Sequence, residues 1–185
     1  MTALDVPSGL QVVVTSGVGA APTDLAAFDA ALQDAHVAQF NIVQLSSVLP
    51  AGSKVVISPE QPAGAWGDVL YAAYAERHAH QHREHACAGM GWVQDEQTGA
   101  GMLVEHGGSS RQEVEDLIRE SLADIARRRT QQFGDVNFEI VNIACVDQPV
   151  CAVVVASFGT SPWWNLCPAA SHLRKQDEVS SADSC

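Results

Sequence analysis

The segment from Ser110 to about Gln132 carries the clearest secondary-structure signal in the sequence. Ser110 followed by Glu113 is the capping-box pattern that begins a helix. Gly134 is placed to end this helix, and the arginines at 127–129 fall where the helix dipole favours cations. Apolar residues recur at helical spacing and form one stripe, made of Val114, Leu117, Ile118, Leu122 and Ile125. The sequence therefore predicts a long amphipathic helix in the second half of the chain.

Most of the remaining sequence predicts strands around a second, shorter helix. Thr23 is the expected N-cap of that helix, which runs to about Ala35. The expected strands are residues 9–16, 40–45, 54–58, 68–75, 86–93, 101–106, 136–146 and 150–158. Alanines leave 68–75 ambiguous between strand and helix, and the last two strands are expected to form a hairpin. This order of elements favours an α+β fold over a regular βαβ alternation.

The predicted elements leave one domain and a tail. A chain of 185 residues suits a single domain, which we expect over residues 1–160. Residues 17–22 contain glycines and a proline and are expected to form the loop that ends the first strand. The pattern fails over residues 161–185, where we expect a flexible tail that includes Trp163 and Trp164.

Composition disfavours several kinds of partner and compartment. The 22 acidic and 10 basic residues give a net charge of −12, which disfavours binding to nucleic acid or to an anionic membrane. Only two residues, Lys54 and Lys175, are lysines, so an enzyme that forms an imine on a lysine has little to use. Residues 1–10 lack a secretion-signal pattern, and no stretch of about 18 apolar residues occurs. The five cysteines include no C-x-x-C pair, so we expect buried thiols and a cytoplasmic protein.

Two polar features in the first 50 residues are candidates for chemistry. Asp29 shares a helical stripe with Leu25 and Leu32, so one carboxylate projects from an otherwise apolar face. Such a carboxylate is exposed, internally hydrogen-bonded, or placed at the end of an apolar slot to bind a cation. Ser46 and Ser47 interrupt a strand-like run before a proline turn, which by itself indicates only a turn or a strand end.

Glu105 is the third candidate. In a strand of period 2 it lies on the same face as Leu103 and not on that of Val104, so it is expected to be partly buried. The alternative is a strand-end charge that faces solvent. Each feature is weak alone, and only their combination and order along the chain are specific.

In that combination the chain resembles the pyruvoyl-dependent arginine decarboxylase family. The resemblance extends over residues 9–158 and is densest in the first 52 residues. The segments that carry it are Ser16-Gly17-Val18-Gly19, Ala27-Phe28-Asp29-Ala30-Ala31-Leu32, Asn41-Ile42-Val43 through Ser46-Ser47-Val48-Leu49-Pro50, and Gly101-Met102-Leu103-Val104-Glu105. The resemblance implies a four-layer αββα sandwich of the pyruvoyl-dependent histidine/arginine decarboxylase type. It also implies a homotrimer of processed α–β protomers, with active sites between neighbouring subunits.

The resemblance further implies that the proenzyme cuts itself between Ser46 and Ser47. The Ser47 hydroxyl attacks the Ser46 carbonyl, and β-elimination breaks the ester that forms. The dehydroalanine left at position 47 hydrolyses to a pyruvoyl group and ammonia. The products are a β chain, residues 1–46, and an α chain, residues 47–185. The covalent pyruvoyl group then forms an imine with the substrate amine and accepts electrons as carbon dioxide leaves.

The resemblance assigns roles to individual residues. Glu105 matches the proton donor, and Asn41 matches a residue that assists processing and lines the site. Asp29 matches the residue that pairs with the distal cation of the substrate, and Leu25 and Leu32 match the apolar walls along its methylenes. The expected reaction converts L-arginine to agmatine and carbon dioxide. The same chemistry on ornithine or lysine is an alternative, as is a non-catalytic trimeric binding protein of this fold.

Three segments depart from the family pattern, and one of them is the tail after Phe158, which extends past the end of that pattern. The family usually has a glycine after the first helix, where this chain has Ala35-His36-Val37. Residues 76–86, expected to be a surface loop, contain four histidines, at positions 78, 80, 82 and 85. His78 and His82 have the i, i+4 spacing of metal ligands on a helix, but no second ligand pair matches them, so we predict no metal site.

Overall fold

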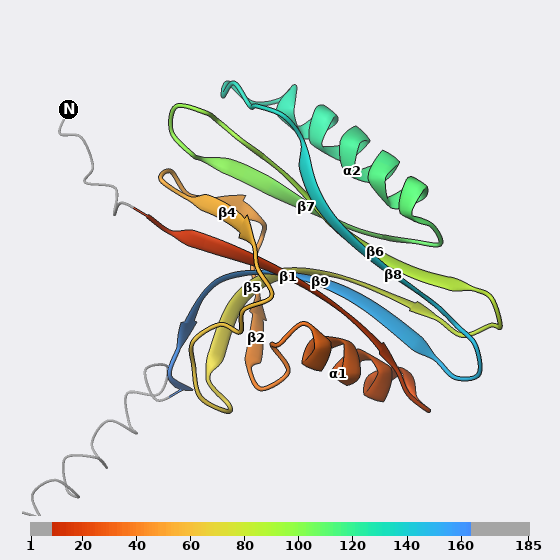
Figure 1. Ribbon diagram of the computed structural model, residues 1–185. Helices are drawn as coiled ribbons and strands as arrows, with labels where there is room; N and C mark the ends of the chain where they lie inside the picture. The colour runs from red at the N-terminus through yellow and green to blue at the C-terminus, as the bar shows by residue number, and fades with distance from the viewer. Residues whose placement is uncertain (1–8, 164–185) are drawn as a thin grey trace, which may run out of the picture.

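The computed structural model describes residues 9–163, which form a mixed α+β fold with two β-sheets (Figure 1). One sheet contains β1 (Gln11–Ala20), β2 (Asn41–Gln44), β4 (Lys54–Ile57), β5 (Val69–Ala79) and β9 (Val150–Ser161), in the order β2-β5-β9-β1-β4. The other contains β3 (Val48–Leu49), β6 (His85–Gln94), β7 (Gly101–Gly108) and β8 (Asn137–Ala144), in the order β3-β7-β6-β8. The predicted α+β class is confirmed.

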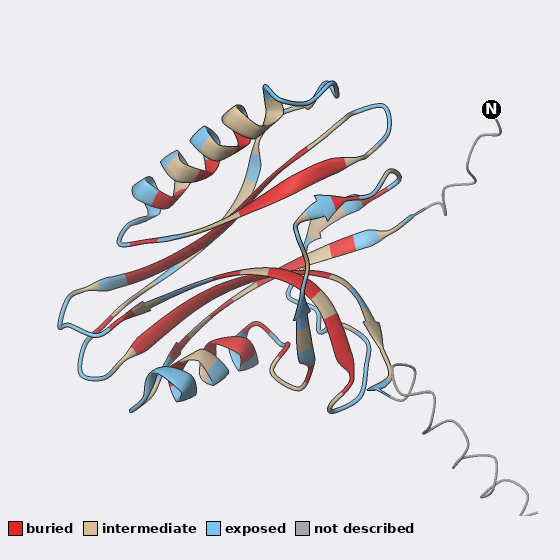
Figure 2. Ribbon diagram, turned by 180° about the vertical axis from the view of Figure 1, so that it is seen from behind, coloured by how far each residue is buried: buried red, intermediate tan, exposed pale blue. Residues whose placement is uncertain are grey.

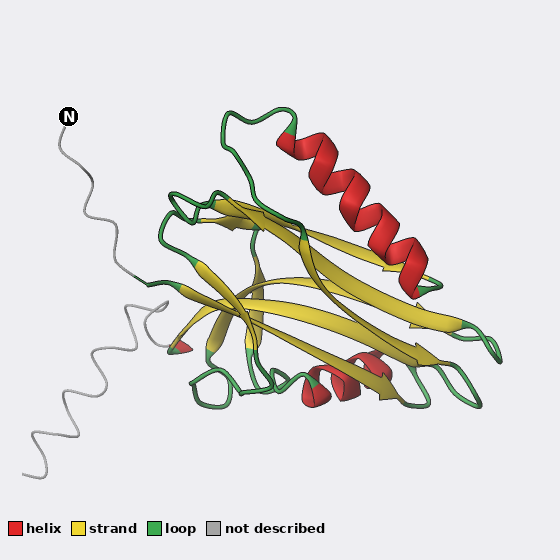
Figure 3. Ribbon diagram, turned by 45° about the horizontal axis from the view of Figure 1, so that its top comes forward, coloured by secondary structure: helices red, strands yellow, loops and turns green. Residues whose placement is uncertain are grey.

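The two sheets pack face to face, and each carries one helix on its outer face (Figure 1, Figure 3). Helix α1 (Asp24–Asp34) covers the five-stranded sheet, and α2 (Arg111–Ala126) covers the four-stranded sheet. The core between the sheets is built from both, with Val14, Met90 and Val154 among its fully buried side chains. Figure 2 shows that many of the buried residues lie in the strands of the two sheets. Within residues 9–163, neither helix has the length and apolar character needed to cross a membrane.

Helix α1 approaches β1 closely because two glycines of the strand face it. A Cβ at Gly17 would collide with the backbone of Ala31 and Ala35, and a Cβ at Gly19 would collide with that of Ala27. The facing helix residues are themselves alanines, so backbone packs against backbone over about two turns. This close contact sets the position of the whole helix, including its outer face.

Both helices begin at the predicted N-caps. The Thr23 side chain accepts a hydrogen bond from the Ala26 N–H (3.2 Å), and the Ser110 side chain accepts one from the Glu113 N–H (3.2 Å). The Glu113 carboxylate accepts hydrogen bonds from the backbone N–H and the hydroxyl of Ser109, each 2.7 Å long. These bonds reach one residue further back than a capping box predicts, and they fix the junction between β7 and α2.

Several predicted boundaries are wrong. The predicted loop at 17–22 is mostly strand, because the glycines there serve close packing against α1 rather than a turn. Helix α2 ends at Ala126, so the arginines at 127–129 follow the helix instead of lying in its last turns. The predicted loop at 76–86 shrinks to residues 80–84, because β5 and β6 extend into it from both sides. The ambiguous segment 68–75 is part of strand β5.

The predicted closing hairpin is also wrong. Strand β8 pairs with β6, whereas β9 pairs with β1 and β5, so the chain changes sheets between them. The short connection resembles a hairpin turn in the sequence. However, β9 is buried on both faces, as a central strand between the inner core and α1 must be. Strand β9 ends at Ser161, and the predicted tail lies, from Trp164 onward, outside the described residues.

The chain leaves α1 through a left-handed residue that is not glycine. His36 has φ 60°, and the Val37 N–H donates a hydrogen bond to the Leu32 carbonyl (2.9 Å). This closure usually uses glycine, because a Cβ costs about 1 kcal/mol or more in that conformation. The histidine therefore occupies the conformation for which the family usually has glycine.

We expect Gly17→Ala to destabilise the protein by about 1–3 kcal/mol, because the new methyl group forces α1 away from β1. Gly134→Ala is the matched control, since its Cβ would come no closer than 3.2 Å to the Glu96 side chain and 3.6 Å to the Gln94 carbonyl. Urea unfolding followed by circular dichroism measures both. Equal midpoints for the two variants would contradict the close packing of α1 on β1.

We expect Glu113→Gln to lower the melting temperature at pH 7 and to have no effect in acid. The hydrogen bonds from the Ser109 backbone N–H and then its hydroxyl hold the pKa of Glu113 below its ordinary value of 4.5. The ionised carboxylate therefore stabilises the fold above the unfolded-state pKa, and this contribution is lost as the pH falls through the lowered folded-state pKa. Calorimetry between pH 3 and 7 tests this, with the exposed Glu120→Gln on the same helix as control. A melting-temperature difference independent of pH would show that the charge is irrelevant.

Candidate active site at the crossover between the sheets

The Ser46–Ser47 peptide lies where the chain crosses from one sheet to the other. On one side the Leu45 N–H donates to the Ala72 carbonyl of the five-stranded sheet (2.9 Å). On the other side the Ser47 carbonyl accepts from the Leu103 N–H of the four-stranded sheet (2.8 Å). The crossover is thus tied to both sheets within three residues, which leaves the serine pair little freedom to relax.

Ser47 has a left-handed backbone, with φ 65°. This conformation costs a residue with a Cβ about 1–2 kcal/mol, and it persists only where the surroundings enforce it. The Ser47 hydroxyl donates a hydrogen bond to Glu105 Oε1. A nucleophilic hydroxyl next to a carboxylate and next to a strained backbone is a recognisable catalytic arrangement.

Glu105 reaches Ser47 from strand β7. Leu103 belongs to the core between the sheets and Val104 to the core under α2, so the predicted face of Glu105 is confirmed. The carboxylate is partly buried, which contradicts the alternative of a solvent-facing strand end. The sequence therefore identifies a carboxylate that the fold delivers to the serine pair.

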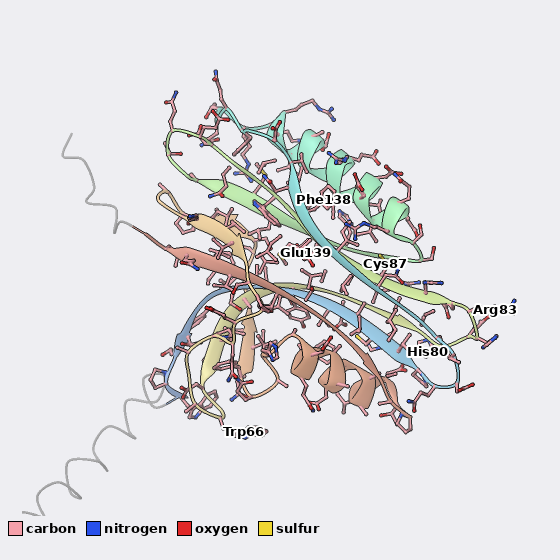
Figure 4. The ribbon with its side chains drawn as sticks, viewed as in Figure 1. Trp66, His80, Arg83, Cys87, Phe138 and Glu139 are labelled. Carbon is pink, nitrogen blue, oxygen red and sulfur yellow. The ribbon has the colours of Figure 1, made fainter. Side chains whose placement is uncertain are left out.

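A second carboxylate on the same sheet was not identified from the sequence. Met90 of β6 pairs with Glu105 on one side and with Glu139 of β8 on the other. Glu139 crosses the gap between the sheets, where its carboxylate accepts a hydrogen bond from the Ser16 hydroxyl of β1 (3.0 Å; Figure 4). A single carboxylate in a strand does not reveal which residue it will contact, so the sequence alone does not predict this hydrogen bond.

Asp29 lies on the exposed side of α1, away from Ser47. Its Oδ2 atom accepts a hydrogen bond from Gln33 Nε2 (2.5 Å). Leu25 is 78% exposed, whereas Leu32 is 9% exposed and packs on the sheet, so the three predicted substrate-binding residues do not form one continuous apolar stripe. The packed face of α1 instead uses small residues, because the glycines of β1 bring the helix so close.

A surface pocket of about 370 Å³ adjoins Asp29. Gln33 and Gln39 also line it, together with Trp66 from the loop between β4 and β5. Neither Ser47 nor Glu105 is among its lining residues. No sequence pattern singles out Gln39 or Trp66, because loop residues reach the pocket only through the folded backbone.

Asn41 is attached to that same loop rather than to the serine pair. Its Nδ2 atom donates a hydrogen bond to the Gly67 carbonyl (2.7 Å), and its backbone N–H donates to the Asp68 carbonyl (2.8 Å). Within residues 9–163 it makes no hydrogen bond to Ser46 or Ser47. The structure therefore brings Ser47 and Glu105 together, and leaves Asn41 and Asp29 on the side of the pocket.

The histidines do not gather around a metal site. His80 Nε2 pairs with Asp24 Oδ1 (2.8 Å), His82 hydrogen-bonds the Val146 carbonyl (3.0 Å), and His85 hydrogen-bonds Asn142 (2.9 Å). No group of three potential ligands among the described residues is arranged to hold a metal ion. The histidines instead connect the β5–β6 turn to neighbouring elements.

Similar proteins were found for most of the chain. A family model described as pyruvoyl-dependent arginine decarboxylase matches residues 11–162. The pyruvoyl-dependent arginine decarboxylase of Methanopyrus kandleri is 29% identical over 152 residues, which is 82% of this chain and 94% of that protein. The one from Thermoplasma volcanium is 33% identical over 103 residues, 55% of this chain and 56% of that protein. The one from Thermococcus kodakarensis is 27% identical over 135 residues, 72% of this chain and 84% of that protein.

We expect the three buried cysteines, Cys87, Cys145 and Cys151, to resist alkylation at pH 8 in the native state. Burial raises the pKa of the Cys87 thiol and raises that of Cys151 to about 12, and the thiolate is the reactive form. Iodoacetamide labelling followed by peptide mass spectrometry tests this, with guanidinium-unfolded protein as the positive control. Rapid labelling of Cys151 in the native protein would contradict its burial.

Proposed function

Because this chain belongs to the pyruvoyl-dependent arginine decarboxylase family, we propose that it cuts itself between Ser46 and Ser47 and converts L-arginine to agmatine and carbon dioxide. The family name implies a decarboxylase with a covalent pyruvoyl group. The observation that carries the proposal is the state of Ser47. Its backbone is left-handed, its hydroxyl contacts Glu105, and its peptide is tied to both sheets.

The proposed cleavage uses the groups present at the crossover. The Ser47 hydroxyl attacks the Ser46 carbonyl carbon, and the peptide bond is replaced by an ester with the amine of Ser47 released. Elimination then breaks the Cβ–O bond of residue 47, and the Ser46 carboxylate leaves as the new C-terminus of the β chain. Hydrolysis of the dehydroalanine at position 47 releases ammonia and leaves the pyruvoyl group. Left-handed strain at Ser47 favours this path, because it raises the energy of the intact peptide.

Glu105 serves the reaction as a carrier of protons. Its carboxylate accepts a hydrogen bond from the Ser47 hydroxyl in the uncut chain, so it faces the atoms that become the pyruvoyl group. The pyruvoyl carbonyl supplies the electron sink for carbon dioxide loss. After decarboxylation, Glu105 donates a proton to the carbon that has lost carbon dioxide. Partial burial between the sheets limits the access of bulk water to this proton.

The proposed active site is completed by a second protomer. Asp29 binds the distal cation of the substrate, and Leu25 and Leu32 flank its methylenes, but the Asp29 pocket is not lined by Ser47. A homotrimer of processed protomers, with the αββα sandwich of the family, supplies Asp29 from one subunit and the pyruvoyl group from its neighbour. The 78% exposure of Leu25 supports this assembly, because an apolar side chain beside a binding carboxylate is then covered. Asn41 lines the same site through the loop that it holds.

We expect Ser47→Ala to abolish self-cleavage and to lower carbon dioxide release from arginine by about a thousandfold or more, because the source of the reactive carbonyl is removed. Ser46→Ala is the matched control, and it should still cleave because the attacking hydroxyl is retained. A denaturing gel with N-terminal sequencing measures cleavage, and fragments 1–46 and 47–185 are expected, the second blocked. A wild-type chain that stays intact would overturn the pyruvoyl mechanism. Cleavage without turnover of arginine, ornithine or lysine would favour the non-catalytic alternative.

A further inference from the structure

Given the proposed decarboxylation of arginine, on which this step rests, we propose that Gln39 and Trp66 complete a guanidinium-binding subsite around Asp29 and select arginine over lysine or ornithine. Both residues line the pocket next to Asp29. Figure 4 shows Trp66 on the loop between β4 and β5, at the outer edge of the molecule. Neither residue takes part in the cleavage at Ser47.

Gln39 brings a side-chain amide to the wall of this pocket. Its Nε2 atom is buried and makes no hydrogen bond within residues 9–163. A buried amide N–H without a partner destabilises the fold, so folding does not depend on this group. The Oε1 atom of Gln39, at the other end of the amide, is not among the buried atoms that lack a partner. This oxygen can accept a hydrogen bond from an N–H donor in the pocket.

Trp66 is a large apolar side chain that is mostly exposed to solvent. It is 88% exposed, yet the residue that follows it is hydrogen-bonded to Gln39 and Asn41. The next residue, Gly67, donates its N–H to the Gln39 carbonyl (2.8 Å) and accepts from the Asn41 side chain (2.7 Å). Gly67 has φ 85°, a conformation that suits glycine, so the turn is specified by the sequence. The backbone that carries the indole is therefore anchored beside the pocket.

A guanidinium group matches these three partners. It is planar, has five N–H donors and no acceptor, and stacks on aromatic rings. Asp29 offers a carboxylate already oriented by Gln33, Gln39 offers an amide oxygen, and Trp66 offers an indole face. A lysine or ornithine ammonium pairs with the carboxylate equally well, but it is compact and more strongly hydrated, so it gains less from the ring and the amide.

Steady-state kinetics of the processed holoenzyme tests this. We expect Trp66→Leu to raise KM for arginine about tenfold, to leave kcat within about twofold, and to change KM for lysine by less than about twofold. Trp66→Phe should retain most of the affinity, since a smaller aromatic face remains. Trp163→Leu removes another exposed indole that does not line the pocket, and it should match wild type.

Gln39→Met separates binding from folding. Because the amide has no partner in the described structure, its loss should leave the melting temperature unchanged or raise it, while KM for arginine rises about fivefold. A lower melting temperature with an unchanged KM would assign Gln39 a structural role and overturn its place in the subsite. If Trp66→Leu fails to fold or assemble, Gln39→Met carries the test.

The two proposals fail in different ways. If wild type neither cleaves nor releases carbon dioxide, the proposed function fails, and calorimetric titration with agmatine still measures the pocket. Agmatine should then bind wild type and Trp163→Leu alike, and bind Trp66→Leu about tenfold more weakly. If wild type turns over arginine but Trp66→Leu and Gln39→Met keep its KM and its preference for arginine over lysine, only the subsite is overturned.

Discussion

The attachment of one short crossover to two different sheets is the constraint on which the site depends. Leu45 is hydrogen-bonded to β5 and Ser47 to β7, so the chain must pass from one sheet to the other within these three residues. A longer linker would let Ser47 relax into an ordinary conformation. Here the left-handed backbone at Ser47 is retained because the sheets on either side are held together by a common core. The same geometry presents the hydroxyl to Glu105.

The sheets can hold the crossover so firmly because helices pack directly onto their central strands. Gly17 and Gly19 on β1 admit the backbone of α1, and Gly89 and Gly91 on β6 admit the side chains of α2. A methyl group at Gly91 would overlap Ile118, which is fully buried beneath α2. The glycines thus act in strands, as positions of close approach, and the outer helices are held at short range from the sheets that carry Ser47 and Glu105.

The local parts of this arrangement could be predicted from the sequence. The N-caps Thr23 and Ser110, the apolar stripe of α2 and the face of Glu105 follow from short-range spacing, which is independent of topology. The partners of β9 could not be predicted in this way, because a short connection looks the same whether the next strand pairs with the previous one or joins the opposite sheet. The predicted loop at the glycines of β1 is wrong for a related reason. The sequence does not distinguish a glycine that makes a loop flexible from a glycine that allows close packing in a strand. Gln39 and Trp66 meet only through the turn at Gly67, and no spacing rule connects them.

The pairing of the strands has a consequence for a chain that is cut after Ser46. Among the described residues, β1 and β2 pair only with β4, β5 and β9, all of which belong to the 47–185 fragment. If the chain is cut there, the two fragments would be interleaved and all of these strand pairings would be kept. What the nick removes is the covalent tether, so refolding of the mature protein becomes a bimolecular association whose yield depends on concentration. The uncut chain folds in a unimolecular reaction, whereas the proposed cut form would persist only as long as its two fragments stay associated.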